Sequence, residues 1–245
     1  MSCSCPQVAS WLHLETLAQS RTVCVEKLSD AHGQQVVRKS YRFPSPSDQV
    51  RGMLRGTLFG KAKAEREFAH LQYLHRAKIP AVQALRACVQ RNVLGFVVDS
   101  HLITIASPGQ TLSQCVVREQ LPSEEIWAAL GASLSRMHQV GFWHRGLAPR
   151  NVLILDEAPF HRWLDPAKSK IYSRTIPQAA RADDLLRFWG TLHKCIPSSH
   201  KQAFEHAYGQ DGVCEPANLW RAIPKRKRAS IERILHRDET RFEES

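Results

Sequence analysis

The sequence has no long hydrophobic run and no paired arrangement of cysteines. No apolar stretch approaches the roughly 18 residues that a membrane-spanning helix needs. The N-terminal segment MSCSCPQVASWLHLETLAQS has neither a basic start nor a continuous apolar stretch. The seven cysteines are odd in number and scattered, so they do not form a disulfide framework. These absences argue against a secreted or membrane-spanning protein and predict a cytoplasmic one with reduced thiols.

Acidic residues are scarce relative to basic ones. Lysine and arginine number 34 against 23 aspartates and glutamates, a net charge of +11. This excess favours anionic partners such as phosphorylated lipids, nucleotides or the inner membrane surface. Nucleic acid is an unlikely partner, because no zinc signature, RNA-binding aromatic motif or recognition helix is present. One cluster is either a solvated face or an anchor for lipid phosphates, and it consists of Lys225, Arg226, Lys227 and Arg228.

Strand patterns dominate the first part of the chain. Residues 22–43 predict a hairpin, and residues 93–99 and 101–106 predict two further strands. Between them, residues 59–78 predict a helix that Ile79-Pro80 ends. The expected apolar face of this helix consists of Phe68, Leu71, Leu74 and His75.

Helical patterns dominate the second part. Ser123 can cap a long amphipathic helix that Gly141 ends, and helices are expected over most of 180–245. The chain is therefore predicted to be an α+β protein of two lobes, a small antiparallel-sheet lobe at 1–106 and a helical lobe at 107–245, with a cleft between them.

The segment HRGLAPRNVLIL, residues 144–155, is close to a phosphotransferase catalytic loop of the form H-x-D-x-x-x-x-N followed by an apolar strand. His144 would brace this loop, and Asn151 would bind a metal ion. Gly146 occupies the position of the usual acidic base. The spacing alone is weak, but a capped helix before it and a strand after it strengthen the prediction.

Phosphoryl transfer also requires groups that hold the phosphates and magnesium. Lys39, within VVRKSYRF, is the candidate for the phosphates, unless it is a solvated lysine on an edge strand. Glu67 is the candidate partner for this lysine, Glu65 is its rival, and a plain surface glutamate is the alternative. Asp165 in RWLDPAK follows Asn151 by 14 residues and would be a second metal ligand, or else a turn-forming aspartate.

Several motifs in order, LSRMHQVGFWHRGLAPRNVLIL, HRWLDPAKSK and RADDLL, resemble the lipopolysaccharide core kinases. This Kdo and heptose kinase family has a protein-kinase-like fold, and the resemblance covers roughly residues 30 to 210. It implies ATP and Mg²⁺ as cofactors, with Lys39 and Glu67 at the nucleotide and Asn151 and Asp165 at the metal. It also implies that Asp184 opens a helix and hydrogen-bonds back to the loop.

The implied reaction transfers phosphate from ATP to a sugar hydroxyl of a glycolipid, at the cytoplasmic face of the inner membrane. Two departures weaken this expectation. Gly146 removes a base that contributes typically about 10²- to 10⁴-fold in rate, and LAQSRTVCVEKL has no glycine for a phosphate-covering flap. The short segment after Asp165 also argues against a peptide substrate. A catalytically inactive pseudokinase that responds to nucleotide is the alternative.

Overall fold

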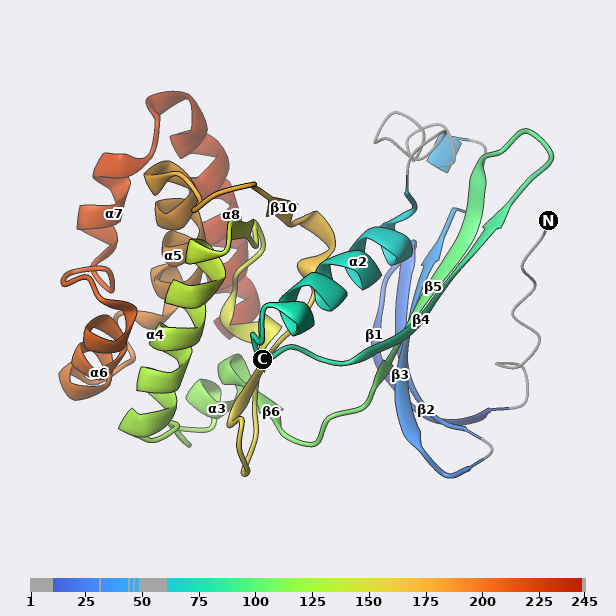
Figure 1. Ribbon diagram of the computed structural model, residues 1–245, viewed down its shortest axis with the longest axis horizontal. Coiled ribbons are helices and arrows are strands. Elements are labelled where there is room, and N and C mark those ends of the chain that lie inside the picture. The colour runs from blue at the N-terminus through green and yellow to red at the C-terminus, as the bar shows by residue number, and fades with distance from the viewer. Residues whose placement is uncertain (1–10, 31, 44, 46, 49–60, 244–245) are drawn as a thin grey trace. The chain divides into compact units, whose positions relative to one another are not determined.

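The computed structural model describes residues 11–243, except 31, 44, 46 and 49–60. The chain divides into two compact units. The first combines Met1–His75 with Val82–Ser107, and the second combines Arg76–Ala81 with Pro108–Ser245. The first unit is a sheet with one long helix, and the second is mainly helical (Figure 1). The predicted lobes were 1–106 and 107–245, whereas residues 76–81 group with the second unit.

A five-stranded antiparallel sheet forms the first unit, in the order β1-β2-β3-β5-β4. Its strands are β1 (Leu12–Gln19), β2 (Val23–Ser29), β3 (Gln35–Arg42), β4 (Ala84–Arg91) and β5 (Val97–Ile105). The hairpin predicted at 22–43 is β2 and β3. The edge strand β1 was not predicted, and it is exposed along its whole length, so it carries little of the alternation that marks a half-buried strand.

The prediction of two strands at 93–99 and 101–106 was wrong. Residues 97–105 form the single strand β5, and its partner β4 was not predicted. A turn joins them, in which the Asn92 side chain accepts hydrogen bonds from the backbone N–H groups of Leu94 and Phe96. Ser100, the residue between the two predicted strands, is fully buried inside β5.

Helix α2 (Lys63–Arg76) belongs to the first unit and begins with a capping contact. The Glu65 carboxylate accepts a hydrogen bond from the Ala62 backbone N–H at 2.7 Å, which satisfies a donor that the first helical turn leaves open. Its buried face comprises Ala64, Glu67, Leu71 and Leu74. His75 was predicted on that face but is exposed. The buried residues recur at positions 64, 67, 71 and 74, and this helical spacing places position 75 beside the buried face rather than on it.

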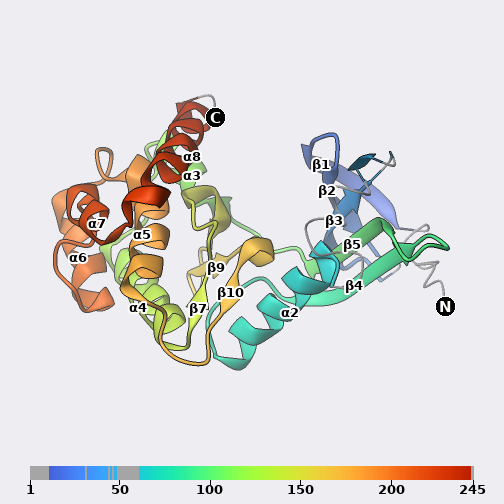
Figure 2. The ribbon, with the colours of Figure 1, turned by 90° about the horizontal axis from the view of Figure 1, so that it is seen from above.

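In its described residues the second unit contains six α-helices and several short elements, and the helices dominate it (Figure 2). The helices are α3 (Leu112–Val117), α4 (Glu124–Gln139), α5 (Gln178–Leu192), α6 (Ser198–Tyr208), α7 (Pro216–Ala222) and α8 (Lys225–Glu243). The short strands are β6 (Gln110–Thr111), β7 (Phe142–Trp143), β8 (Val152–Ile154), β9 (His161–Trp163) and β10 (Lys170–Ile171). Ser123 occupies the N-cap position of α4 as predicted, but its side chain makes no capping hydrogen bond. Gly141 follows the C-cap residue with φ +87°.

Aromatic side chains form the centre of the helical unit. Trp127 of α4 stacks on Trp189 of α5 at 5.4 Å between ring centroids, and both are fully buried. Phe204 of α6 lies edge-on to Trp189 at 5.1 Å. Helices α4 and α6 approach closely at Gly131, where a Cβ atom would lie 2.3 Å from the Phe204 carbonyl oxygen. Any larger residue there would force the two helices apart.

None of the helices in the described ranges is both long enough and apolar enough to cross a bilayer.

Candidate phosphotransfer site

Lys39 and Glu67 form an ion pair within the first unit. Lys39 lies on β3, between β2 and β5, and its Nζ atom is 3.1 Å from Oε1 of Glu67 on α2. Glu67 is 3% exposed, so a paired cation is needed to keep its carboxylate charged. The alternatives of an edge-strand lysine and of Glu65 as the partner do not describe this geometry, since β3 is central and Glu65 caps α2.

Tyr41 completes this pair, and the sequence analysis did not identify it. Its hydroxyl donates a hydrogen bond of 2.5 Å to Oε2 of Glu67. Both carboxylate oxygens are therefore engaged, one by Lys39 and one by Tyr41, which fixes the plane of the carboxylate. A signal was present in the sequence: Tyr41 follows Lys39 by two positions, so the two side chains lie on the same face of the strand.

The catalytic-type loop of the second unit is held by a buried carboxylate. Asp184 of α5 is fully buried and accepts hydrogen bonds from the backbone N–H groups of His144 at 2.9 Å and Arg145 at 2.8 Å. Arg145 has φ +61°, a conformation that costs energy and needs such support. The prediction that Asp184 opens a helix was wrong, because α5 begins at Gln178. The predicted bond back to the loop is present.

His144 ties the loop to the strand that precedes Asp165. Its Nε2 lies 3.0 Å from the carbonyl oxygen of Leu164, so this nitrogen carries the proton and donates. The side chain is fully buried, and burial lowers the pKa of His144 below its ordinary value. His144 is therefore a neutral structural brace, as predicted for the loop.

Asn151 and Asp165 lie at the same end of the β8–β9 hairpin. Val152 pairs with Trp163, and one step further the Leu164 N–H donates to the Asn151 carbonyl at 2.9 Å. The Asn151 side-chain nitrogen donates to the Gly146 carbonyl at 2.7 Å. This bond fixes the orientation of the amide and uses its nitrogen, so the oxygen is the atom that the predicted metal site would use. Asp165 has the left-handed conformation φ +50°, ψ +52°, and is exposed.

These two oxygens suit magnesium better than a metal held by protein ligands alone. Among the described residues, no group of three or more His, Cys, Asp or Glu side chains could hold a metal ion. Magnesium typically takes one or two protein oxygens and completes its shell with phosphates and water. The Asn151 amide oxygen and the Asp165 carboxylate oxygens are ligands of that kind, so the prediction of a magnesium site at these two residues is consistent with their chemistry.

The position of the missing base is open. A Cβ atom built on Gly146 would meet only Nδ1 of His144, at 3.7 Å, which is an ordinary contact. The φ angle of Gly146 is not in the left-handed region. The backbone would therefore accept an aspartate, and its replacement by glycine is not imposed by the fold.

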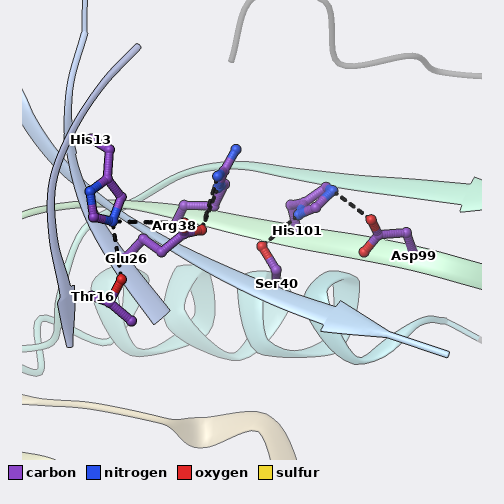
Figure 3. A network of polar contacts seen from close by, with 7 residues as sticks. All are labelled: His13, Thr16, Glu26, Arg38, Ser40, Asp99 and His101. Carbon is purple, nitrogen blue, oxygen red and sulfur yellow. Dashed lines mark hydrogen bonds and ion pairs between the residues drawn. The ribbon is translucent and has the colours of Figure 1, made fainter. Parts of the chain in front are cut away.

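A serine, a histidine and an aspartate also meet on the sheet (Figure 3). Ser40 Oγ lies 2.9 Å from His101 Nδ1, and His101 Nε2 lies 3.2 Å from Asp99 Oδ2. Ser40 is fully buried, so no substrate can reach its hydroxyl. It alternates with Lys39 along β3 and thus lies on the opposite face of the sheet. We interpret the three residues as a cross-strand contact rather than a hydrolytic site.

Comparison with known proteins identifies the family. The sequence model described as the lipopolysaccharide kinase (Kdo/WaaP) family matches residues 14–208. The chain belongs to this family. It is also similar to the 3-deoxy-D-manno-octulosonic acid kinases of three Haemophilus influenzae strains, PittEE, KW20/Rd and 86-028NP. Each is 26% identical over 119 residues, which is 43% of this chain and 49% of the relative. The chain thus spans about half the length of the curated relatives it matches.

A solved structure, "WaaP in complex with acyl carrier protein", shares the fold. The TM-score is 0.58 at 17% identity, covering 93% of this chain and 89% of that chain. This likeness concerns the fold alone, and it confirms the predicted α+β, protein-kinase-like architecture. Within this lipopolysaccharide kinase family member, the roles of Lys39, Glu67, Asn151 and Asp165 in catalysis remain predictions.

Proposed function

We propose that this lipopolysaccharide kinase family member transfers phosphate from ATP to a sugar hydroxyl of a core glycolipid. The observation that carries the proposal is the Lys39–Glu67 ion pair, fixed by Tyr41, in a chain that also has the braced loop of His144 and Asn151. The curated relatives are named as kinases of 3-deoxy-D-manno-octulosonic acid, which supports a sugar acid of this class as the acceptor.

Each polar residue has a distinct task in this proposal. Lys39 binds the nucleotide phosphates, and Glu67 with Tyr41 keeps its ammonium group in place. Asn151 and Asp165 hold Mg²⁺, which when bound neutralises charge on the transferring phosphate. Asp184 and His144 act through the backbone, because they hold the loop and the strand end on which Asn151 and Asp165 lie.

The absence of an acid at position 146 leaves the acceptor hydroxyl without a base from the loop. Phosphoryl transfer depends mainly on positioning and charge neutralisation, so the remaining residues can support a reduced rate. A loss of about 10²- to 10⁴-fold relative to a base-containing loop follows from the usual contribution of general base catalysis.

The same observation favours a second candidate, a pseudokinase. In this alternative, Lys39 and Asp165 bind Mg·ATP without turnover, and nucleotide binding regulates a partner. The turn between β1 and β2, residues 20–22, contains no glycine, so a glycine-rich flap of the usual kind does not close over the phosphates.

Membrane contact belongs to the proposal as well. The basic cluster 225–228 forms the first turn of α8, and its members differ in their surroundings. Arg228 donates to the carbonyl oxygens of Ile223 and Trp220, whereas Lys225 and Arg226 are exposed. We expect these two to contact an anionic membrane surface from the cytoplasmic side, each worth about 1 kcal/mol.

The test is ADP release by the purified chain with ATP, Mg²⁺ and core glycolipid. We expect glycolipid-dependent release that Asp165→Asn and Lys39→Met abolish. At 100 times its dissociation constant, Mg·ATP should stabilise the chain by about 2.7 kcal/mol, a rise in melting temperature of roughly 5 to 10 °C for this length. A nucleotide-induced shift without ADP release would establish the pseudokinase. No shift, and no effect of Asp165→Asn, would refute both.

A further inference from the structure

Two cations lie over the ring of Trp143, next to the catalytic-type loop. The Arg145 guanidinium carbon is 5.0 Å from the ring centroid, and Lys227 Nζ is 5.3 Å from it. Trp143 ends β7, Arg145 is the second residue of the loop, and Lys227 lies in the first turn of α8. The half-buried ring therefore holds together side chains from the loop and from the C-terminal helix.

Two further lysines adjoin this arrangement. Strand β10 lies beside β7 (Figure 2). The two strands pair antiparallel, with Lys170 opposite Trp143. Lys170 Nζ lies 4.7 Å from the ring centroid of Tyr172, which is 6.4 Å from that of Trp143. The carbonyl oxygen of Lys168 is 3.5 Å from Nη1 of Arg145, and the Lys168 side chain is exposed. We call Arg145, Lys168, Lys170 and Lys227 the basic collar.

The basic collar carries positive charge that its surroundings do not compensate. Within the described part of the chain, none of its four side chains forms an ion pair. The acids on the adjoining helix α5 are already engaged: Asp183 pairs with Arg187, and Asp184 accepts from the loop backbone. Arg145 and Lys227 share the Trp143 ring, and Lys170 lies opposite Trp143 on the paired strand. Like charges gathered in this way repel, and a bound anion relieves that repulsion.

The geometry suits a phosphate group. A guanidinium presents a planar fork of donors to phosphate oxygens, and lysines add mobile point charges around them. Arg145 directly precedes Gly146, the position at which an acid would orient the acceptor hydroxyl. An anion held by Arg145 would therefore lie beside the place where the acceptor reacts.

We propose that the basic collar binds a phosphate group already present on the acceptor glycolipid, and so positions the sugar for phosphorylation. This inference rests on the proposed function and names the substrate more closely, as a phosphorylated core oligosaccharide. The position of Lys227 over Trp143 assigns that lysine to the acceptor. Lys225, two residues earlier in the same helical turn, is exposed, and its proposed contact is with a membrane surface, which an assay with soluble oligosaccharide does not contain. It therefore serves as the matched control.

The test measures binding of deacylated, phosphorylated core oligosaccharide by calorimetry, without ATP. Removing one cation near an anionic ligand costs about 1 kcal/mol, so Lys227→Gln and Arg145→Gln should each weaken binding about five-fold. Lys225→Gln should leave it unchanged. Oligosaccharide treated with phosphatase should bind weakly and equally to all four proteins. Melting temperatures of the variants confirm that each is folded, and Lys227→Gln carries the test if Arg145→Gln does not fold.

Two results would overturn the inference. One is an equal loss of oligosaccharide affinity in Lys225→Gln and Lys227→Gln, which would indicate general electrostatic attraction rather than a defined binding site. The other is a defect of Lys227→Gln seen only with vesicles of phosphatidylcholine and phosphatidylglycerol, which would assign the collar to the membrane. A chain that binds the phosphorylated oligosaccharide as expected but releases no ADP would contradict the proposed catalysis and still support the acceptor site.

Discussion

Gly146→Asp tests whether this loop lacks only its base. The substituted Cβ would meet Nδ1 of His144 at 3.7 Å and nothing closer, and the backbone at 146 is not left-handed. Replacing glycine at such a position restricts the unfolded chain and stabilises by about 0.4–1 kcal/mol. Placing a half-buried carboxylate there offsets part of this gain. We therefore expect a net change within about 1 kcal/mol, or roughly 2–4 °C in melting temperature.

The rate should respond much more strongly than the stability. A positioned base contributes about 10²- to 10⁴-fold, which corresponds to about 2.7–5.4 kcal/mol of the barrier at 1.36 kcal/mol for each factor of ten. The KM for ATP should stay constant, because Lys39, Asn151 and Asp165 are untouched. The increase should therefore appear in kcat for glycolipid-dependent ADP release.

Gly146→Asn is the matched control, since it has nearly the same size and cannot act as an equivalent base. The double variant Gly146→Asp, Asp165→Asn should stay inactive if the new carboxylate works only with a bound metal. The reasoning would be refuted if folded Gly146→Asp released ADP less than ten times faster than the natural chain. A ten-fold increase in rate corresponds to a lowering of the activation barrier by about 1.4 kcal/mol. It would also be refuted if Gly146→Asn gave the same increase.

Three further predictions concern Tyr41, Asp184 and His161, the buried first residue of β9. Tyr41→Phe removes the 2.5 Å hydrogen bond to Glu67. It should lower the free energy of unfolding by about 1–3 kcal/mol and raise the KM for ATP. An unchanged midpoint in a denaturant titration would contradict this prediction. Asp184→Asn places an amide nitrogen against one of the two backbone N–H groups that the carboxylate accepts from. It should cost about 2–3 kcal/mol, measured by thermal unfolding. Burial lowers the pKa of His161 to about 4, so the native state favours the neutral ring. The contribution of His161 to the free energy of unfolding should be fully present above its pKa in the unfolded chain, near 6.5. It should be lost as the pH falls toward the folded-state pKa of about 4, by about 3 kcal/mol in all. His161→Phe should flatten this part of the acid unfolding curve.

The loop and its neighbours could be predicted because their residues are close together in the sequence. His144, Gly146 and Asn151 lie in one loop between β7 and β8, and β9, which leads to Asp165, follows β8 directly. Backbone connectivity over such short distances leaves few arrangements. The β2–β3 hairpin and helix α4 were predictable for the same reason, since periodicity and turn residues are local signals.

Strands β1 and β4 and the residue Tyr41 were missed for the opposite reason. Strand β1 is exposed throughout and has no buried face to produce alternation. Strand β5 carries Asp99, Ser100 and His101 in its middle, and only the pairing of β5 with β3 places the His101 ring against Ser40. Partners brought together by sheet pairing leave no mark on the local pattern.

The sequence by itself determined the family, the order of strands before helices, and the replacement of the base by Gly146. These features depend only on residue types and on their spacing along the chain. Only the tertiary structure decided that Glu67 rather than Glu65 pairs with Lys39, that Tyr41 holds the second carboxylate oxygen, and that Lys227 lies over Trp143. Each of these contacts joins residues distant in the chain, and their choice of partner depends on how sheet and helix surfaces pack, which no local pattern specifies.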